Sequence, residues 1–148
     1  MKIGFGSDHA GFYLKENLKK YLEEKGHDVV DYGTHSDERV DYPDFAEKVA
    51  LAVASKEVEK AVLVCGSGVG ISISANKVHG IRACCCSEPY SARMSVRHNN
   101  ANIICMGARI VGEDLAKMIV DEFFEAEFEG GRHEGRVKKM MNLEKHLW

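Results

Sequence analysis

The residues best suited to chemistry are a cysteine and the glycine-rich loop that follows it, residues 65–70 (CGSGVG). The loop separates an apolar run from an amphipathic one, so we expect it to join a buried strand to a helix. Its glycines permit a tight turn that directs backbone N–H groups at a ligand, and a helix N-terminus adds partial positive charge. Such a loop can stabilise a phosphate or a reaction oxyanion, with the Cys65 thiolate as a base. The alternative is that Cys65 only ends a buried strand and the glycines only permit the turn.

Known phosphate and nucleotide loops fit this segment poorly. A phosphate P-loop needs G-x-x-x-x-G-K-[ST], and the sequence contains no such string. A cysteine phosphatase loop would carry an arginine shortly after the cysteine, whereas the next residues here are Gly, Ser, Gly, Val, Gly and Ile. A dinucleotide fingerprint needs G-x-G-x-x-G, but residues 66–70 read G-x-G-x-G, and His9 replaces the last glycine after Gly4 and Gly6. A nucleotide-binding module therefore stays open as an alternative.

Two further pairs of residues could handle protons or bind a sugar. Asp8 and His9 follow the first apolar run, where they could orient a sugar hydroxyl and contact a phosphate. Asp8 could also cap the next helix, which does not exclude the other role. His98 and Asn99 end a helical segment; the histidine could transfer protons, but these residues alone favour a C-terminal capping pair.

Basic residues gather near the C-terminus. Arg132 and Arg136 are four residues apart, so on a helix they share a face, with His133 nearby. Two guanidinium groups on one face suit a phosphate, although such charges usually form a solvated face. Residues 130–148 hold five Lys or Arg and two acidic residues, so this segment could face an anionic ligand or a partner subunit. Arg109, after the last apolar run, is a further candidate.

Short apolar runs alternate with amphipathic segments along the whole chain. We expect strands at residues 2–6, 29–31, 60–65, 81–87 and 102–107. We expect a helix after each strand and a last helix that ends near Leu147. Strands that are apolar throughout must be covered on both faces, so the pattern predicts an α/β fold, a three-layer α/β/α sandwich around a five-stranded parallel sheet with a C-terminal helix. Ligands of such sheets bind beyond the carboxyl ends of the strands.

Length and composition describe an ordinary globular domain. The 148 residues fit one domain over 1–148, with 45% hydrophobic and 29% charged residues. A net charge of −3 argues against a nucleic-acid partner or an anionic membrane, and no apolar run approaches the roughly 20 residues of a membrane span. The five cysteines are odd in number and three are consecutive, residues 84–86, so we expect reduced thiols, no zinc site and a cytoplasmic protein. We see no signal peptide.

Six segments together resemble the type B ribose-5-phosphate isomerases and related sugar-phosphate isomerases. These segments are GSDHAG (residues 6–11), VDYPDFA (40–46), CGSGVGISISANK (65–77), GIRA (80–83), RHNNAN (97–102) and GGRHEGRV (130–137). The resemblance covers nearly the whole chain and implies a Rossmann-like subunit. One branch of the family has a glutamate base at the position of Ile71 and lacks the loop cysteine, so this sequence resembles the cysteine branch.

The resemblance assigns a role to each candidate. Cys65 resembles the general base, and Ser67 with the N–H groups of Gly66, Gly68 and Gly70 resembles the enediolate stabilisers. Asp8 and His98 resemble the residues that open the sugar ring, beside the binding residue Asn99. The remaining substrate-binding residues are the phosphate contacts His9, Arg109, Arg132 and Arg136, and Tyr42, which lines the sugar pocket.

The family implies an aldose–ketose isomerase of the pentose phosphate pathway that interconverts D-ribose 5-phosphate and D-ribulose 5-phosphate through a cis-enediolate. No metal and no cofactor are expected. A homodimer or a dimer of dimers is implied, with active sites shared between subunits. An isomerase of allose 6-phosphate or galactose 6-phosphate is the first alternative, because it needs only a slightly longer pocket. A non-enzymatic module that binds a nucleotide or phosphometabolite is the second.

Overall fold

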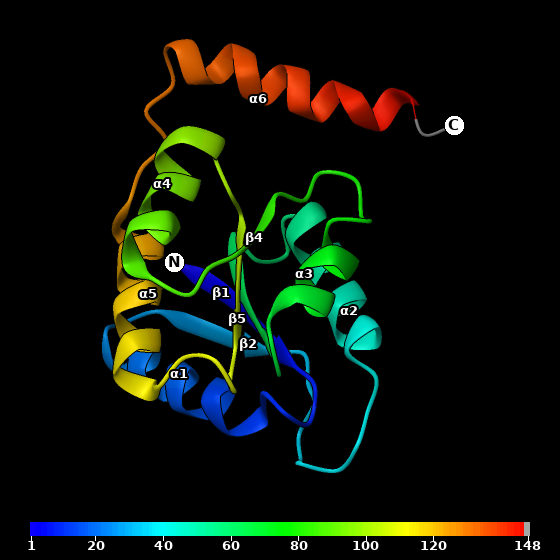
Figure 1. The fold of residues 1–148 in the computed structure, drawn as a ribbon, viewed down its shortest axis with the longest axis vertical. Coiled ribbons are helices and arrows are strands. Elements are labelled where there is room, and N and C mark those ends of the chain that lie inside the picture. Colours follow the sequence, from blue (N-terminus) through cyan, green and yellow to red (C-terminus); the bar gives the residue numbers. More distant parts are fainter. Residues whose placement is uncertain (147–148) are drawn as a thin grey trace.

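The structure, a computed structural model, describes residues 1–146. Its five parallel strands are arranged in the order β2-β1-β3-β5-β4. The strands are β1 (Lys2–Ser7), β2 (Asp28–Asp31), β3 (Lys60–Cys65), β4 (Ala83–Cys85) and β5 (Ile103–Gly107). The helices are α1 (Phe12–Glu24), α2 (Tyr42–Ala54), α3 (Val69–Ala75), α4 (Pro89–Asn99), α5 (Glu113–Glu125) and α6 (Arg132–Asn142), followed by a 3₁₀ turn η1 (Leu143–His146). Each strand is followed by the helix of the same number, as predicted (Figure 1).

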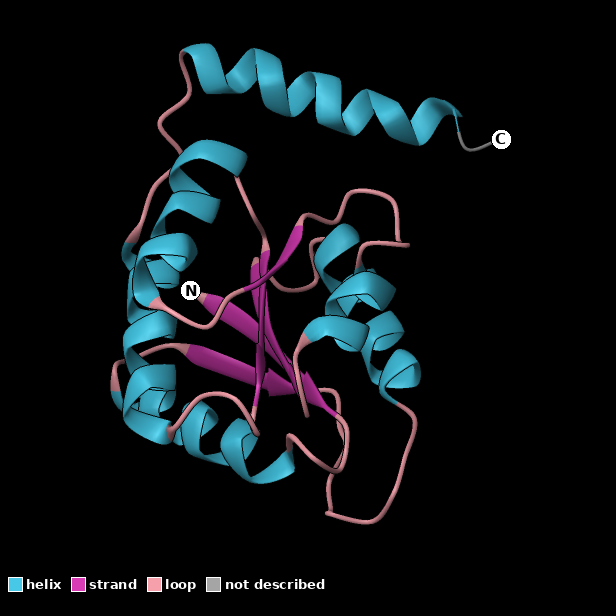
Figure 2. Cartoon of the chain, in the orientation of Figure 1, coloured by secondary structure: helices cyan, strands magenta, loops and turns pink. Residues whose placement is uncertain are grey.

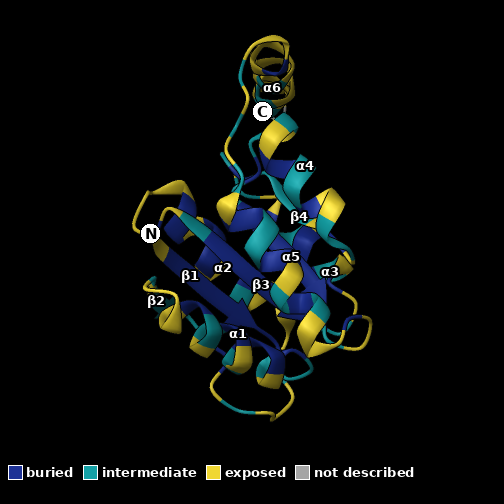
Figure 3. Cartoon of the chain, turned by 90° about the vertical axis from the view of Figure 1, so that its left-hand side faces the viewer, coloured by how far each residue is buried: buried dark blue, intermediate teal, exposed yellow. Residues whose placement is uncertain are grey.

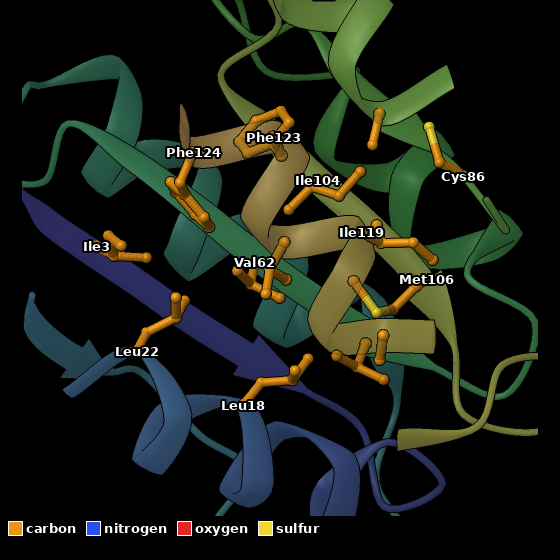
Figure 4. Packing of buried hydrophobic residues seen from close by; sticks show 14 of the residues in the cluster. Ile3, Leu18, Leu22, Val62, Cys86, Ile104, Met106, Ile119, Phe123 and Phe124 are labelled. Atoms are coloured by element: carbon orange, nitrogen blue, oxygen red, sulfur yellow. The ribbon is translucent and has the colours of Figure 1, made fainter. Parts of the chain in front are cut away.

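Helices cover both faces of the sheet because its central strands are apolar on both sides. Val62 and Val64 of β3 pack in a cluster with α1, α4 and α5, and Figure 4 shows part of this cluster. Leu63 and Cys65 lie on the other face of the same strand and pack in a second cluster with α2 and α3. Burial of each large apolar side chain contributes about 1.5–3 kcal/mol. The predicted three-layer α/β/α, Rossmann-like sandwich is confirmed (Figure 2).

Local sequence accounts for where several elements begin and end. Gly26 follows α1 with φ +94°, a conformation that glycine adopts without steric cost. Pro89 opens α4, and the Glu88 carboxylate accepts the Ser91 N–H at 2.9 Å, which satisfies a donor at the helix start. Asn100, in the left-handed conformation, ends α4. The segment after β4 therefore returns across the sheet as a well-defined helix.

Strand β4 is shorter than predicted. We expected residues 81–87, but only Ala83–Cys85 is a strand. The Arg82 N–H donates to Asn102 Oδ1 at 2.8 Å, and the Ala83 N–H donates to Asn76 Oδ1 at 2.8 Å. These side chains accept the backbone N–H groups where the strand begins, so those groups do not pair with another strand. β4 is also the outermost strand of the sheet, with only β5 beside it. The predicted end of the last helix near Leu147 lies outside the described residues.

Helix α6 stands apart from the sandwich. Figure 1 shows it across one end of the molecule, and Figure 3 shows that it is mostly exposed. His133 is its one buried residue. Beyond its end, Glu144 Oε1 accepts the Gly80 N–H at 2.8 Å. No helix within residues 1–146 has both the length and the apolar character that crossing a membrane would require.

Candidate active site

An open cavity of about 430 Å³ lies where β1, β3 and β5 end. Its lining residues are Asp8, Tyr42, Cys65, Gly66, Ser67, Gly70, Arg109 and Ile110. All of these except Ile110 are among the predicted site residues. They come from segments distant in the sequence that the parallel strands bring together at their carboxyl ends, where ligands of such folds bind. We call this end of the sheet its carboxyl edge. We call this hollow the Cys65 cavity.

The sulfur of Cys65 lies within the turn of the glycine loop. The Gly68 N–H donates to Cys65 Sγ at 3.1 Å, and the residue is only 4% exposed. A backbone donor directed at a sulfur is an arrangement suited to a thiolate. Ser67 is exposed beside it, and its Oγ accepts the Val69 N–H at 3.2 Å. That acceptance leaves the hydroxyl proton of Ser67 free to donate to a ligand oxygen.

Two positions of the loop require glycine for different reasons. Gly68 has φ +81°, and a Cβ there would come within 2.7 Å of the backbone carbonyl carbon of Met106. Gly70 has its Cα against the ring of Tyr42, so a Cβ would lie 2.7 Å from that ring. The loop is therefore pressed against β5 on one side and Tyr42 on the other. Its path, and with it the position of the Cys65 sulfur, is fixed by packing.

Asp8 and His9 follow β1 and have different surroundings. Asp8 is buried, and its Oδ1 accepts the Gly11 N–H at 3.0 Å just before α1, which leaves Oδ2 for the cavity. The turn-capping role and a ligand role are thus compatible for this carboxylate. His9 does not line the cavity; its Nδ1 lies 3.2 Å from both the backbone nitrogen and the carbonyl oxygen of Val40. The Val40 backbone thus occupies Nδ1, and Nε2 is the ring atom left for a ligand.

Arg109 lies over the start of the glycine loop. Its backbone N–H donates to the Gly66 carbonyl at 3.1 Å, and the Ala108 N–H donates to the Cys65 carbonyl at 2.8 Å. The Arg109 guanidinium lies so close to Gly66 that a Cβ there would be 3.1 Å from Nη1. The segment after β5 thereby closes one side of the Cys65 cavity with a positive charge.

The other predicted residues lie beyond the amino ends of the strands, which we call the opposite edge of the sheet. His98 and Asn99 end α4, which runs back from the carboxyl edge, and Arg132 and Arg136 lie on α6. Within this chain, none of the four lines the Cys65 cavity. Asn99 instead lines a hollow of about 420 Å³ beneath α6, together with apolar residues such as Ile81, Met140 and Met141. The structure thus divides the predicted site residues into two groups, one at each edge of the sheet.

His98 belongs to a cluster that sequence reasoning did not find. Its ring stacks on that of His133, with centroids 4.2 Å apart and planes 9° from parallel. Glu129 lies beside both rings, with Oε2 3.8 Å from His98 Nε2 and Oε1 3.7 Å from His133 Nε2. Burial, His98 and Arg132 lower the pKa of His133, against the opposing effect of Glu129. The one sequence signal for this cluster is the four-residue spacing of Glu129 and His133.

A metal ion does not suit these three groups, although their ligand atoms lie within 4.8 Å of one another. A metal binds an imidazole in the plane of the ring, and the rings of His98 and His133 are stacked nearly parallel. One ion cannot lie in both planes. Glu129 is also engaged by Arg97, whose Nε donates to Oε2 at 2.6 Å.

The whole chain is similar to known sugar-phosphate isomerases. A family model described as Ribose/Galactose Isomerase matches residues 3–140. Ribose-5-phosphate isomerase B of Escherichia coli is 55% identical over 143 residues, which are 97% of this chain and 96% of that protein. The structure of Clostridium thermocellum ribose-5-phosphate isomerase B has a TM-score of 0.99 and 54% identity, with both chains covered completely. A Mycoplasma genitalium ribose-5-phosphate isomerase B with bound ribulose-5-phosphate has a TM-score of 0.93 and 40% identity, and 97% of this chain and 96% of that chain are covered.

Proposed function

The chain belongs to the ribose/galactose isomerase family, and from that premise we propose that it interconverts D-ribose 5-phosphate and D-ribulose 5-phosphate with Cys65 as the base. The observation that carries this assignment is the Cys65 sulfur, which receives the Gly68 N–H at 3.1 Å in a cavity shared with Asp8 and Ser67. In the open-chain sugar, the hydrogen on the carbon beside the carbonyl is acidic. A thiolate in this cavity can remove it.

The proposed reaction moves one proton between two neighbouring carbons. The Cys65 thiolate takes the proton from C2 of the aldose, and the electron pair forms the C1–C2 double bond of a cis-enediolate. The Ser67 hydroxyl and the loop N–H groups donate to the negative oxygen, a stabilisation of about 3 kcal/mol per donor. The Cys65 thiol then returns the proton to C1, and the proton of the C2 hydroxyl passes to the oxygen on C1, which leaves a ketone at C2 and a hydroxyl at C1. These proton transfers use neither a redox group nor a metal.

We propose that a complete active site needs a second copy of the chain. His98, Asn99, Arg132 and Arg136 lie at the sheet edge opposite the Cys65 cavity, so one chain cannot place all of them on one small sugar. Apolar side chains around the cavity support a covering partner, because large exposed apolar patches mark interaction sites. These side chains are Tyr42, Val69, Ile73 and Ile110, which are 40–62% exposed. We therefore propose a homodimer or a dimer of dimers with shared sites.

The second copy would supply ring opening and phosphate binding. His98 of one subunit and Asp8 of the other can transfer the protons that open the furanose ring, since the substrate is mostly cyclic. Arg132 and Arg136 would bind the phosphate together with His9 and Arg109. The sugar would lie between Tyr42 and Asn99. Binding energy from the phosphate then orients the reacting carbons at the sulfur.

A deuterium-exchange experiment with Cys65→Ala tests the proposed base. In heavy water, the wild-type protein should convert ribose 5-phosphate and place deuterium at C2 of the recovered aldose. Cys65→Ala should abolish both conversion and labelling while still binding the sugar phosphate by calorimetry. Cys84→Ala is the matched control, because Cys84 lines the hollow beneath α6 and does not line the Cys65 cavity. Wild-type labelling by folded Cys65→Ala would reject Cys65 as the base.

We also propose the domain organisation, the cellular location and the substrate preference of the enzyme. One isomerase domain over residues 1–148 acts in the cytoplasm, where its five free cysteines stay reduced. The family description names galactose as well as ribose, so a six-carbon sugar phosphate is the competing substrate. Comparison of kcat/KM for ribose 5-phosphate and allose 6-phosphate separates the two. We expect the five-carbon sugar to be preferred.

A further inference from the structure

Glu129 is held against the last turn of α4 by two contacts with one residue. Its backbone N–H donates to the Arg97 carbonyl at 3.0 Å, and its Oε2 accepts from Arg97 Nε at 2.6 Å. The segment between α5 and α6 is thereby fixed to the helix that carries His98. A charged hydrogen bond of this length fixes the direction of the carboxylate. The same carboxylate faces the stacked rings, with Oε2 beside His98 and Oε1 beside His133.

The two imidazoles differ in exposure. The His98 side chain is 38% exposed, whereas that of His133 is 8% exposed. His133 Nε2 is buried and has no hydrogen-bond partner among the described residues, so Glu129 Oε1 at 3.7 Å is the anion it faces. A movement of less than 1 Å would bring the carboxylate into hydrogen-bond contact with either ring. One carboxylate therefore serves two imidazoles.

The surrounding charges permit only one proton on the pair. Two imidazolium rings stacked 4.2 Å apart would repel each other. From α4 the cation Arg97 faces the pair, and from α6 the cations Arg132 and Arg136 add to the repulsion, while Glu129 opposes it. Burial and these cations act against a charge on His133 and lower its pKa.

We propose that Glu129 is a positioning residue that holds the stacked His98–His133 pair in place and stabilises the single exchangeable proton that this pair carries. The electrostatic part of this inference stands on the structure alone. Its catalytic consequence rests on the proposed function, in which His98 opens the sugar ring. The pair would deliver one proton to the ring oxygen and recover one, with no second charge next to the phosphate-binding arginines.

A histidine NMR titration without substrate tests the electrostatic part. The Cε1–H signals of His98 and His133 are followed from pH 5 to pH 9 in the wild type and in Glu129→Gln. In the wild type the pair should take up one proton over this range. Because Glu129 stabilises the positive charge, its loss should weaken proton uptake about three- to tenfold, which moves the midpoint to lower pH. Glu129→Asp, which keeps the charge, should restore part of the difference.

Glu122→Gln is the matched control. Glu122 pairs with Arg93, one turn before Arg97 on the same helix, at 3.6 Å, and it does not face the stacked rings. This variant should titrate as the wild type does. The inference is overturned if His98 and His133 each take up a full proton above pH 5, or if Glu129→Gln leaves the midpoint unchanged in a folded protein.

Kinetics with the cyclic sugar separates the catalytic consequence from the electrostatic one. The low-pH limb of kcat/KM for ribose 5-phosphate should shift in Glu129→Gln in the same direction as the NMR midpoint. If the NMR midpoint moves and this limb does not, the positioning of the pair stands and the ring-opening role of His98 fails. If neither moves, the positioning role itself is rejected.

Discussion

The two edges of the sheet carry different kinds of chemistry and are built differently. At the carboxyl edge, the Cys65 sulfur lies in a backbone turn that packs between β5 and Tyr42, so its position is set by close contacts. At the opposite edge, Arg132 and Arg136 lie on an exposed helix outside the sandwich. The first edge has the packed geometry that proton abstraction from carbon needs. The second has the exposed cationic side chains that we propose to bind the phosphate.

This difference explains how one small fold can serve a sugar phosphate. A base must be placed within a fraction of an ångström, because misplacement of about 1 Å costs roughly 100-fold in rate. A phosphate can be bound by long cationic side chains that adapt to it. The split also means that neither edge is sufficient alone. A second copy that brings its exposed edge to the first copy's cavity would unite the two.

Mixing two inactive variants is the strongest test of this division. Cys65→Ala and His98→Ala should each lose about 1,000-fold or more in kcat, because each site would lack its base or its ring-opening acid. After joint unfolding and refolding of equal amounts, half of the dimers are mixed, and each of these contains one intact site. We expect about a quarter of wild-type activity, measured by formation of ribulose 5-phosphate.

Each variant refolded alone is the control for that experiment and should stay inactive. A mixture that also stays inactive, although mass spectrometry detects mixed dimers, would mean that Cys65 of one chain and His98 of another do not combine in one site. The two edges would then not act together in one active site.

Replacing a glycine tests how far the carboxyl edge depends on close packing. Gly68→Ala introduces a Cβ at φ +81° that would lie 2.7 Å from the Met106 carbonyl carbon. We expect a loss of about 1–3 kcal/mol in the free energy of unfolding and about 100-fold in kcat, as the turn shifts beneath the sulfur. Urea unfolding and steady-state kinetics measure the two effects.

Gly112→Ala is the matched control, because a Cβ there would have no neighbour within 4 Å and the residue has an ordinary negative φ. It should change stability by a few tenths of a kcal/mol to about 1 kcal/mol and leave kcat unchanged. Full activity in Gly68→Ala would show that the turn tolerates movement.

Removing an arginine tests the opposite edge. Arg136→Ala should raise KM for ribose 5-phosphate about tenfold or more, because charged hydrogen bonds contribute about 1.5–3 kcal/mol, while kcat changes less. Lys139→Ala, which removes another cation from α6, should leave KM near the wild-type value. An unchanged KM in Arg136→Ala would return Arg136 to the role of a solvated surface charge.

The sequence alone allowed the carboxyl edge to be predicted, because its signals are local. The alternation of strand and helix fixes which loops meet, and the loops after residues 7, 65 and 107 do meet at the Cys65 cavity. The extent of β4 could not be predicted, since it depends on the side chains of Asn76 and Asn102 that take its backbone donors. Periodicity does not report such long-range hydrogen bonds.

The cluster around His98 lay beyond sequence reasoning for a similar reason. Contact between Arg97 and Glu129 joins residues that are 32 positions apart, and it depends on how the segment between α5 and α6 returns to α4. The sequence favours His98 as part of a helix cap, and no motif in it points to Glu129. Only the fold shows that they share one carboxylate–imidazole contact.

A buried ion network near the carboxyl edge should have the smallest effect on catalysis. Lys15 is fully buried, and its Nζ donates to Asp31 Oδ2 at 2.6 Å and to the Thr34 carbonyl at 2.7 Å, at the start of the loop that leads to Tyr42. Burial raises the pKa of Asp31, but hydrogen bonds from Lys15, Lys19 and the Gly33 N–H outweigh it, and the net pKa is lowered. The ionised Asp31 therefore stabilises the fold above its unfolded pKa of about 3.8, and this contribution is lost as pH falls through the lower folded value.

Asp31→Asn should cost about 3 kcal/mol at pH 7, because it leaves the buried Lys15 with only the more exposed Glu16 as a counter-ion, and it should flatten the loss of stability below pH 4. Urea unfolding at a series of pH values measures both effects. Glu16→Gln, which removes a more exposed partner of Lys15, should cost under about 1 kcal/mol. In both folded variants kcat should stay within about twofold of the wild type, because Asp31 holds the frame of the carboxyl edge and touches none of the reacting groups. A large fall in kcat with stability intact would mean that this network reaches the sulfur, and that the packed edge extends further than the glycine loop.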